Sequence, residues 1–308
     1  MSAKARITTN RREKPYLLGV VASYMNTHQR WVYFEHLLKS VQQQTTPLDR
    51  LFIGMSFPSK EKMSEANPKL KAWQKALGQN LVKFILCARP LTQGEMWGKM
   101  WTKCLSKKIP KDSWILFGDD DDLWHPNRVQ LYRQGVESVR NLDFYRECID
   151  VRVPCYAEPA VKQPTFTLAG IATATDVDRM LDKGAVVLKK TILGNVLEGR
   201  NVHGGNYVDH CVPSHIFGEF LQESNAFMLR NKQCDVMFQT FVLRKEGKHI
   251  SIPEAPWMYF WRKHSDATCN KLTNEVKWAT DSCGVVVRRF MSRLGDWETM
   301  LDAACNQC

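Results

Sequence analysis

Short apolar runs alternate with longer amphipathic segments through the first half of the chain. A short run bounded by turn residues is typical of a buried strand, whereas apolar residues three or four positions apart are typical of a helix. Alternation on this scale predicts an α/β fold with a mostly parallel central sheet and ligand-binding loops along one edge. The expected strands are residues 16–23, 51–56, 81–87 and 114–117, and the expected helices are 29–44, one within 58–80, 94–105 and 127–140.

The pattern in the second half of the chain is weaker. Residues 165–175 are strand-like, residues 203–206 form a turn, and residues 215–223 predict a further helix. The first 14 residues are polar and basic, and we expect them to form a flexible tail. The remainder, 15–308, is long enough for one large α/β domain with ample core, although length alone also allows two smaller domains.

The chain carries a formal net charge of +11 at pH 7, which admits three kinds of partner: nucleic acid, an anionic membrane surface and anionic small substrates. The basic residues are scattered, and we find neither a long basic helix nor a recognisable nucleic-acid motif. No apolar run approaches the length of a membrane span, and no signal peptide is expected at the start. Charge alone therefore does not decide among the three.

Ten cysteines without an export signal predict free thiols in a reducing compartment, so we expect a cytoplasmic location. Cys305 and Cys308 form a CxxC pair, but no second pair stands at zinc-finger spacing, and a structural zinc site is not favoured. A prenylation signal also fits poorly, because Asn306 and Gln307 are not aliphatic.

Four consecutive aspartates, Asp119 to Asp122, directly follow the apolar run 114–117 and Gly118. Adjacent carboxylates repel one another and stay ionised more easily when a cation lies among them. Hard divalent ions such as Mg²⁺ and Mn²⁺ prefer oxygen ligands and keep positions open for phosphate oxygens. The end of a buried strand is also where open α/β sheets bind ligands, which favours a metal site here. The alternative is a solvated acidic turn that starts the next helix.

Four segments of the first half stand out: VVASYMN, the helix end SVQQQTTP, the strand LFIGMS and the acidic segment ILFGDDDDLWHPNR. Taken together, they resemble the nucleotide-binding half of a family 2 glycosyltransferase. Members of this family have the GT-A fold, a Rossmann-like α/β sandwich with an Asp-x-Asp motif. The order of the segments is far more specific than an Asp-x-Asp motif alone.

A second series of segments extends the resemblance. CDVMF opens a helix, RKEGK is a turn, HISIPE is a strand that ends in Pro-Glu, and YFWRKH follows. The family shows a similar series: an acidic pair, a helix, a Lys/Gly turn, a strand ending in Pro-Glu, and Tyr-Arg-x-His. The resemblance covers residues 16–140 and 232–268, and it implies one GT-A domain with a nucleotide-sugar-binding half, 15–140, and an acceptor-binding half, 141–308.

The resemblance implies a divalent metal, Mn²⁺ or Mg²⁺, that neutralises the diphosphate of the donor. Asp121 would bind this metal directly, and Asp119 would contact the donor ribose or the metal. His264 would be a further metal ligand or a diphosphate contact, with a structural histidine as the alternative. Asp120 takes the variable middle position on the donor side, and Asp122 would support the metal ligands or the helix start.

Four further residues are candidates for binding the donor nucleotide. Ser23 and Tyr24 close the first strand and resemble donor-nucleoside contacts, with ordinary turn chemistry as the alternative. Ser56 closes the second strand, where the family often has an Asp that this chain lacks, so base recognition would differ. Lys99 takes the position of a basic residue that touches the nucleotide in relatives, although a solvated helix face is the simpler interpretation.

Sugar transfer also needs a base that removes the proton of the acceptor hydroxyl. Asp235 is the candidate, because it matches the family's acidic position before the C-terminal helix; a helix-capping carboxylate is the alternative, and one residue can do both. Cys234 replaces the family's usual Glu beside it. Asp209 is the reserve candidate. An aspartate base opposite the leaving group would imply inversion at the anomeric carbon.

The sequence thus predicts a metal-dependent, inverting hexosyl- or pentosyltransferase that uses a nucleotide-sugar donor, with a UDP-sugar as the default. The acceptor is expected to be a glycan, a lipid-linked molecule or a protein. The sequence does not narrow this further, because residues 148–224, in the region that shapes the acceptor pocket of this fold, match little of the family. The basic tail would suit peripheral contact with an anionic membrane, and no nucleic-acid partner is expected. Two alternatives stay open: another divalent-metal phosphate enzyme, such as a nucleotidyltransferase or nuclease, and a non-catalytic basic nucleic-acid-binding protein.

Overall fold

The computed structural model describes residues 14–124, 126–140, 145–152, 197–198, 207–231, 234–251 and 259–260, and all structural statements below concern these residues. The tail 1–13, the segments 165–175 and 203–206, and His264 lie outside them. The described strands are β1 (Tyr16–Tyr24), β2 (Arg50–Ser56), β3 (Val82–Cys87), β4 (Ser113–Asp119), β5 (Leu123–Trp124), β6 (Cys148–Arg152), β7 (Leu197–Glu198), β8 (His210–Pro213), β9 (Lys248–Ser251) and β10 (Tyr259–Phe260).

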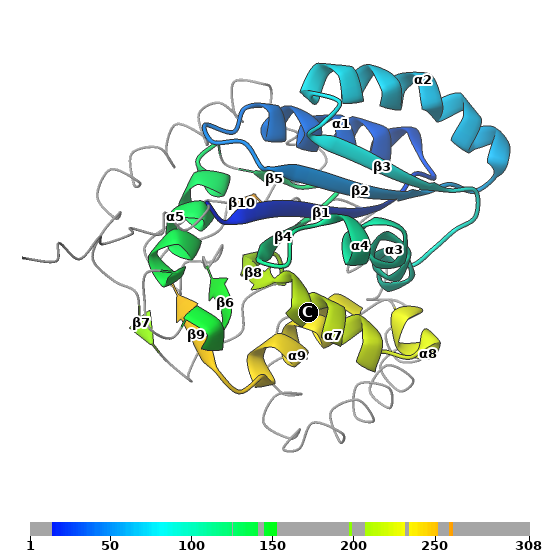
Figure 1. Cartoon of the computed structure of the whole chain (residues 1–308). Helices are drawn as coiled ribbons and strands as arrows, with labels where there is room; N and C mark the ends of the chain where they lie inside the picture. The colour runs from blue at the N-terminus through cyan, green and yellow to red at the C-terminus, as the bar shows by residue number, and fades with distance from the viewer. Residues whose placement is uncertain are drawn as a thin grey trace, which may run out of the picture.

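Helices cover both faces of the sheet that these strands form. In Figure 1, α1 and α2 lie together on one side of the first strands, and α3, α7, α8 and α9 gather on the other. Two short 3₁₀ turns, at Tyr145–Glu147 and Tyr207–Asp209, and a π-helical turn at Trp101–Leu105 complete the described elements. The helices are α1 (His28–Gln42), α2 (Lys60–Leu77), α3 (Gln93–Met100), α4 (Ser106–Lys108), α5 (Arg128–Arg140), α7 (Ser214–Glu223), α8 (Ala226–Leu229) and α9 (Cys234–Arg244).

The described residues form an eight-stranded sheet in the order β3-β2-β1-β4-β8-β6-β9-β7, and β5 pairs with β10 separately (Figure 1). Strands β3, β2, β1 and β4 are parallel, as is β6 with β9, whereas β8 runs antiparallel to both its neighbours and β7 runs antiparallel to β9. The predicted α/β class with a mostly parallel central sheet is confirmed. This is the architecture expected of a GT-A sandwich.

The carboxyl ends of the first four strands meet at one edge of the sheet. The register places Tyr24 of β1 beside Ser56 of β2, and Ala22 of β1 beside Asp119 of β4. The interiors of β1, β2 and β4 are almost wholly apolar and buried, as expected for parallel strands covered by helices on both faces. The polar residues that end these strands are therefore gathered at one place.

The predicted elements of this half agree with the structure to within a few residues. One difference lies after β3, where the expected helix 94–105 is α3 followed by the π-helical turn. Another lies after the acidic segment, where α5 begins at Arg128 and not at the preceding Asn127. The helix expected at 215–223 is α7, and CDVMF does open a helix, α9.

Helices α1 and α3 are among those that begin at a side chain accepting a backbone N–H group, the usual role of a capping residue. At the start of α1, the Thr27 hydroxyl oxygen accepts the N–H of Arg30 at 3.2 Å. At the start of α3, Thr92 and Glu95 form a reciprocal capping box. Both helices begin close to the polar edge of the sheet, so their first turns carry side chains toward it.

The cysteines of the described residues, Cys87, Cys104, Cys148, Cys211 and Cys234, are all buried free thiols, in line with the expectation from the sequence. The CxxC pair, Cys305 and Cys308, lies outside the described residues. Within the described segments we find no helix with the length and apolar character that a membrane crossing requires.

A buried cluster of one carboxylate and two imidazoles joins the central strands. Asp150 of β6 contacts His210 Nδ1 of β8 at 2.5 Å and His249 Nδ1 of β9 at 2.7 Å. Burial alone would raise the pKa of Asp150, but the hydrogen bonds from both histidines lower it to about 2. Burial lowers the pKa of His210. Burial also acts to lower the pKa of His249, but the hydrogen bond and the charge of Asp150 together outweigh it and raise that pKa. The cluster therefore holds an ionised Asp150 between two histidines whose pKa values are shifted in opposite directions.

We expect Asp150→Asn to lower the free energy of unfolding by about 3 kcal/mol, because removing one partner of a buried ion pair leaves the other uncompensated. The contribution of Asp150 is present above its usual pKa of 3.8 and is lost as pH falls toward 2. The contribution of His249 is full below 6.5 and is lost as pH rises through its raised pKa.

The difference between variant and wild type should therefore be largest between pH 4 and 6.5, and urea denaturation at pH 3, 5.5 and 9 measures it. Glu147→Gln, an exposed charge next to β6, is the control and should change stability little. A difference that stays constant across these pH values would contradict the assignment of charges.

Candidate functional site

The predicted acidic segment lies at the polar edge of the sheet. Asp119 is the last residue of β4, and Asp120 and Asp121 follow in the turn that leads to β5. Asp120 is only 3% exposed, and its Oδ2 accepts a hydrogen bond of 2.5 Å from the Ser23 hydroxyl of β1. Asp122 is fully buried. The structure thus brings the aspartates and Ser23 together, whereas a solvated acidic turn would leave all four carboxylates exposed.

Arg30, in the first turn of α1, bridges two of these aspartates. Its Nη2 lies 3.1 Å from Asp120 Oδ1, and its Nη1 donates to Asp121 Oδ2 at 2.5 Å. The Arg30 side chain is 17% exposed, so water screens these pairs only in part. The Asp120 carboxylate, which raises the pKa of Arg30 despite the opposing effect of burial, keeps the guanidinium charged. Arg30 was not predicted as a site residue from the sequence.

Asp119 belongs to a second network, which reaches across to the other half of the chain. The Tyr207 hydroxyl donates to Asp119 Oδ1. The Gln93 amide, at the start of α3, lies 2.7 Å from the Tyr207 hydroxyl and 3.3 Å from Asp119 Oδ1. Neither Gln93 nor Tyr207 was predicted. Their hydrogen bonds fix the Asp119 carboxylate, whereas Arg30 contacts the other two aspartates, Asp120 and Asp121.

An aromatic cluster holds Tyr207 in position. Its ring lies 5.6 Å from that of Trp97 and 6.0 Å from that of Phe117, measured between centroids. Phe217 and Phe238 pack against the same two rings with centroid distances of 4.9 to 5.8 Å. Tilted and edge-on contacts of this kind favour one orientation of each ring. The Tyr207 hydroxyl that donates to Asp119 therefore belongs to a ring held rigidly by apolar packing.

The electrostatics of the cluster indicate a shortage of positive charge. Burial raises the pKa of Asp119 to about 8, and the neighbouring Asp121 carboxylate adds to this rise. Burial also raises the pKa of Asp120 to about 6, although the Arg30 guanidinium offsets part of the effect. A further cation among these oxygens would favour the ionised forms and lower both pKa values.

The donor set of Asp119 and Asp121 fits Mg²⁺ or Mn²⁺. Both residues offer carboxylate oxygens, and Mg²⁺ is commonly held by one or two carboxylates with phosphate oxygens and water completing its shell. Among the described residues, no group of three or more His, Cys, Asp or Glu side chains is arranged to hold a metal by itself. The predicted third ligand, His264, lies outside the described residues. Asp119 and Asp121 therefore suit a metal ion that is also coordinated by a phosphate ligand.

Asp235, the predicted base, faces the same cluster from the first turn of α9. Its charge helps to raise the pKa of both Asp119 and Tyr207, so the three groups are close in space. Burial raises the pKa of Asp235 to about 6, and the N–H of Val236 partly opposes this. The residue remains partly accessible to solvent. A carboxylate with a pKa near neutral is suited to accept a proton.

Asp209, the reserve candidate for the base, lies in the 3₁₀ turn before β8 and is fully buried. Its backbone oxygen accepts a hydrogen bond of 2.7 Å from the Tyr132 hydroxyl of α5. A carboxylate without solvent access cannot meet an acceptor hydroxyl unless the surrounding residues move. The geometry therefore favours Asp235 over Asp209.

The strand-end residues predicted to contact the nucleoside differ in accessibility. Ser56 is fully buried, and its hydroxyl donates to the backbone oxygen of Ser23 at 3.3 Å. The Ser56 hydroxyl therefore helps to fix the backbone of Ser23, whose own hydroxyl donates to Asp120. Tyr24, the last residue of β1, is partly exposed at the same edge and is better placed to meet a ligand.

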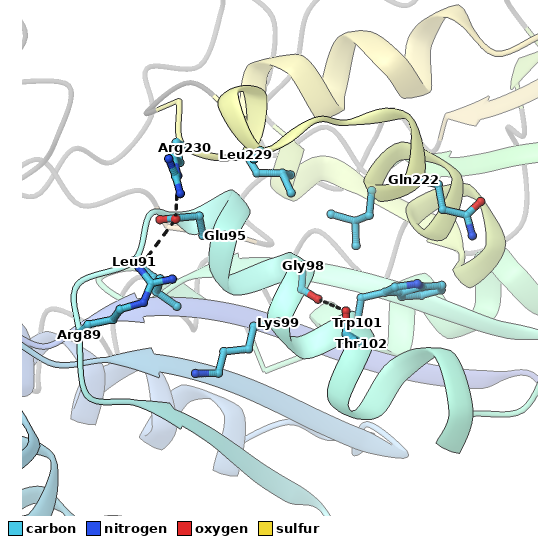
Figure 2. Close-up of a pocket in the computed structure, with 12 residues that line it drawn as sticks. Arg89, Leu91, Glu95, Gly98, Lys99, Trp101, Thr102, Gln222, Leu229 and Arg230 are labelled. Atoms are coloured by element: carbon cyan, nitrogen blue, oxygen red, sulfur yellow. Dashed lines mark hydrogen bonds and ion pairs between the residues drawn. The ribbon is translucent and has the colours of Figure 1, made fainter.

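Lys99 lies apart from the aspartates, in a cavity of about 630 Å³ between α3, α7 and α8 (Figure 2). Gln93, which does reach Asp119, is six residues earlier on α3, or about 9 Å along the helix axis. The described contacts of Lys99 include a hydrogen bond to the Cys87 thiol, whose pKa falls below its usual value although burial opposes this. A nucleotide contact by Lys99 stays a prediction.

The rim of the cavity in Figure 2 carries arginines that share one carboxylate. Glu95 Oε1 lies 3.3 Å from Arg230 Nε and 3.9 Å from Arg89 Nη1. Both arginine side chains are about two-thirds exposed, at 68% and 65%, so these ion pairs contribute little to stability.

No protein-family model and no curated protein sequence matches this chain. Its fold is similar to that of several solved structures at low sequence identity. For TarS of S. aureus, the identity is 9% and the TM-score 0.46, over 80% of this chain and 36% of that one. For TarS in complex with UDP-GlcNAc, the values are 10% and 0.44, over 80% and 58%. For GalNAc-T7 with UDP, GalNAc and Mn²⁺, they are 12% and 0.48, over 81% and 44%.

The chain thus spans less than two thirds of the solved chains to which it is similar. These likenesses are too weak to assign an activity. The case for one is made from the site itself.

Proposed function

We propose that this protein is a divalent-metal-dependent glycosyltransferase of the GT-A type, which transfers a hexose or pentose from a nucleoside-diphosphate sugar with inversion. A UDP-sugar is the preferred donor. The acceptor is a glycan, a lipid-linked molecule or a protein, and residues 15–308 act as one domain with a donor half and an acceptor half. A cytoplasmic location, with contact to an anionic membrane surface, is part of the same proposal.

The observation that carries the proposal is the meeting of three carboxylates from distant segments at the carboxyl edge of a parallel sheet. Asp119 ends β4, Asp121 lies in the turn that follows it, and Asp235 lies in the first turn of α9. Asp119 is close enough to Asp235 for the charge of one to raise the pKa of the other. In open α/β sheets this edge is where ligands bind. Asp119 and Asp121 suit a metal ion that also contacts phosphates, and Asp235 suits the removal of a proton from a nearby acceptor hydroxyl.

In this proposal Asp119 and Asp121 would hold Mn²⁺ or Mg²⁺, and the ion would supply positive charge that stabilises the leaving diphosphate. Tyr207 and Gln93 fix the orientation of Asp119 through their hydrogen bonds. Ser23 fixes Asp120. Tyr24 and Ser23 contact the nucleoside, and His264 is a further metal or diphosphate contact. Lys99 is proposed to contact the nucleotide as well.

Asp235 removes the proton from the acceptor hydroxyl as that hydroxyl attacks the anomeric carbon. Its pKa of about 6 leaves it mostly ionised at neutral pH, yet basic enough to hold the proton that it receives. The bond to the acceptor oxygen forms as the bond to the diphosphate breaks, and the configuration at the anomeric carbon inverts.

The proposal is tested by donor hydrolysis across a panel of nucleotide sugars, each with Mn²⁺, with Mg²⁺ and with EDTA. We expect slow release of one nucleoside diphosphate that depends on metal and stops with EDTA. Release of pyrophosphate, or cleavage of a polynucleotide, would instead identify a nucleotidyltransferase or nuclease. Salt-sensitive nucleic-acid binding that ignores metal, together with no binding of any donor, would identify a non-catalytic binding protein.

A further inference from the structure

Arg30 engages the same carboxylate that the proposed function assigns to the metal. Its Nη1 lies 2.5 Å from Asp121 Oδ2, and its Nη2 lies 3.1 Å from Asp120 Oδ1. The planar guanidinium therefore spans two consecutive aspartates, each through a different nitrogen. Such charge-assisted contacts define geometry as well as providing energy, because both N–H directions are fixed in one plane.

The position of Arg30 is set by secondary structure. The Thr27 cap starts α1 so that Arg30 stands in its first turn, at the carboxyl edge of β1. The carboxylates on which it acts are held independently, Asp120 by the Ser23 hydroxyl and the turn by the end of β4. The contact is thus made between two rigid elements that are 91 residues apart in sequence.

A divalent ion at Asp121 and the Arg30 guanidinium repel each other. At separations of a few ångströms, and with water largely excluded, this repulsion is considerable. The two cations also draw on the same carboxylate, since Arg30 already donates to Asp121 Oδ2. Binding of a metal must therefore weaken the contact between Arg30 and Asp121, and that contact must weaken the binding of the metal.

We propose that Arg30, through its contacts with Asp120 and Asp121, competes with the divalent metal for the Asp121 carboxylate. This inference rests on the proposed function, which supplies the metal. It assigns to Arg30 an effect opposite to that of a merely structural residue. Loss of a structural residue would disorder the aspartates and weaken metal binding, whereas loss of a competitor strengthens it.

The test is direct titration with Mn²⁺ without nucleotide, followed by the electron paramagnetic resonance signal of the free ion. We expect Arg30→Gln to bind Mn²⁺ about tenfold more tightly than wild type, because one positive charge beside the metal is removed. Arg30→Lys keeps the charge but loses the bidentate geometry, and we expect a gain of about threefold. Lys39→Gln, in the last turn of the same helix, is the matched control and should leave the affinity unchanged.

Melting temperatures of all variants show whether each is folded, and Arg30→Lys decides the matter should Arg30→Gln not fold. Unchanged or weaker Mn²⁺ binding by the folded Arg30 variants would overturn the inference about Arg30. It would do so even if Mn²⁺ binding by the wild type depends on Asp121, which would leave the proposed function standing. Mn²⁺ binding that is insensitive to Asp121→Asn would overturn the metal site itself, and with it both proposals. These two failures are distinguishable in the same titration.

Discussion

Replacing Asp121 by Asn is expected to reduce metal-dependent donor hydrolysis by about a thousandfold, a loss typical of removing one group that stabilises charge in a transition state. The variant keeps the size of the side chain and can still accept a hydrogen bond from Arg30. It loses the negative charge that a hard divalent ion requires. The effect should thus be on metal binding and catalysis, with little change in folding.

Release of nucleoside diphosphate over a range of Mn²⁺ concentrations measures this effect. Raising Mn²⁺ should restore part of the rate if weakened metal binding is the cause. Asp112→Asn is the matched control, because Asp112 is an exposed aspartate in the turn just before β4. Activity of Asp121→Asn within a few-fold of wild type would exclude Asp121 as a metal ligand, whereas equal losses in both variants would indicate a general effect of charge.

Replacing Asp235 by Asn is expected to reduce sugar transfer to the acceptor by about a thousandfold, within the range found for removal of a general base. Binding of the donor should change little, because the donor is assigned to the other carboxylates. In wild type, kcat/KM should rise with pH and level off above a midpoint near or below 6, because the base acts only when ionised. A bound cation next to Asp119 can only lower that midpoint.

The comparison with Asp209→Asn separates the two candidate bases. Each variant is measured for transfer, for donor binding and for melting temperature. We expect Asp209→Asn to lower the melting temperature, because Asp209 is fully buried, and to transfer normally once folded. Loss of transfer by Asp209→Asn at an unchanged melting temperature would move the role of base to Asp209. A product with retained anomeric configuration would remove the need for a base of this kind altogether.

The strands and the acidic edge were predictable because each is encoded within a short stretch of chain. The apolar run that becomes β4 and the aspartates after it are adjacent in sequence, so pattern alone places the carboxylates at the end of a strand. Helices α1, α5 and α7 show apolar residues on one face. For Asp235, the resemblance to a known series of segments was needed, since nothing in its neighbourhood distinguishes a base from a cap.

The residues that complete the site were not predictable, because they act through contacts between distant segments. Arg30 is 91 positions from Asp121, and Tyr207 is 88 positions from Asp119. A single Arg in a helix, or a Tyr after a glycine-rich stretch, carries no local sign of such a partner. The burial of Ser56 behind Ser23 is equally a result of strand order, which the periodicity of single elements does not specify.

The antiparallel strand β8 has a consequence for how the molecule is assembled during synthesis. β8 pairs with the edge of β4 that does not pair with β1, yet it follows β4 by about a hundred residues. Closing so long a loop costs conformational entropy before the pairing of β8 with β4 can stabilise the chain. Strands β1 to β4 and their helices can form as soon as they leave the ribosome, with the edge of β4 still unpaired. Tyr207, just before β8, arrives only with that late strand. Nascent chains therefore acquire the acidic edge before they acquire the partner that orients it.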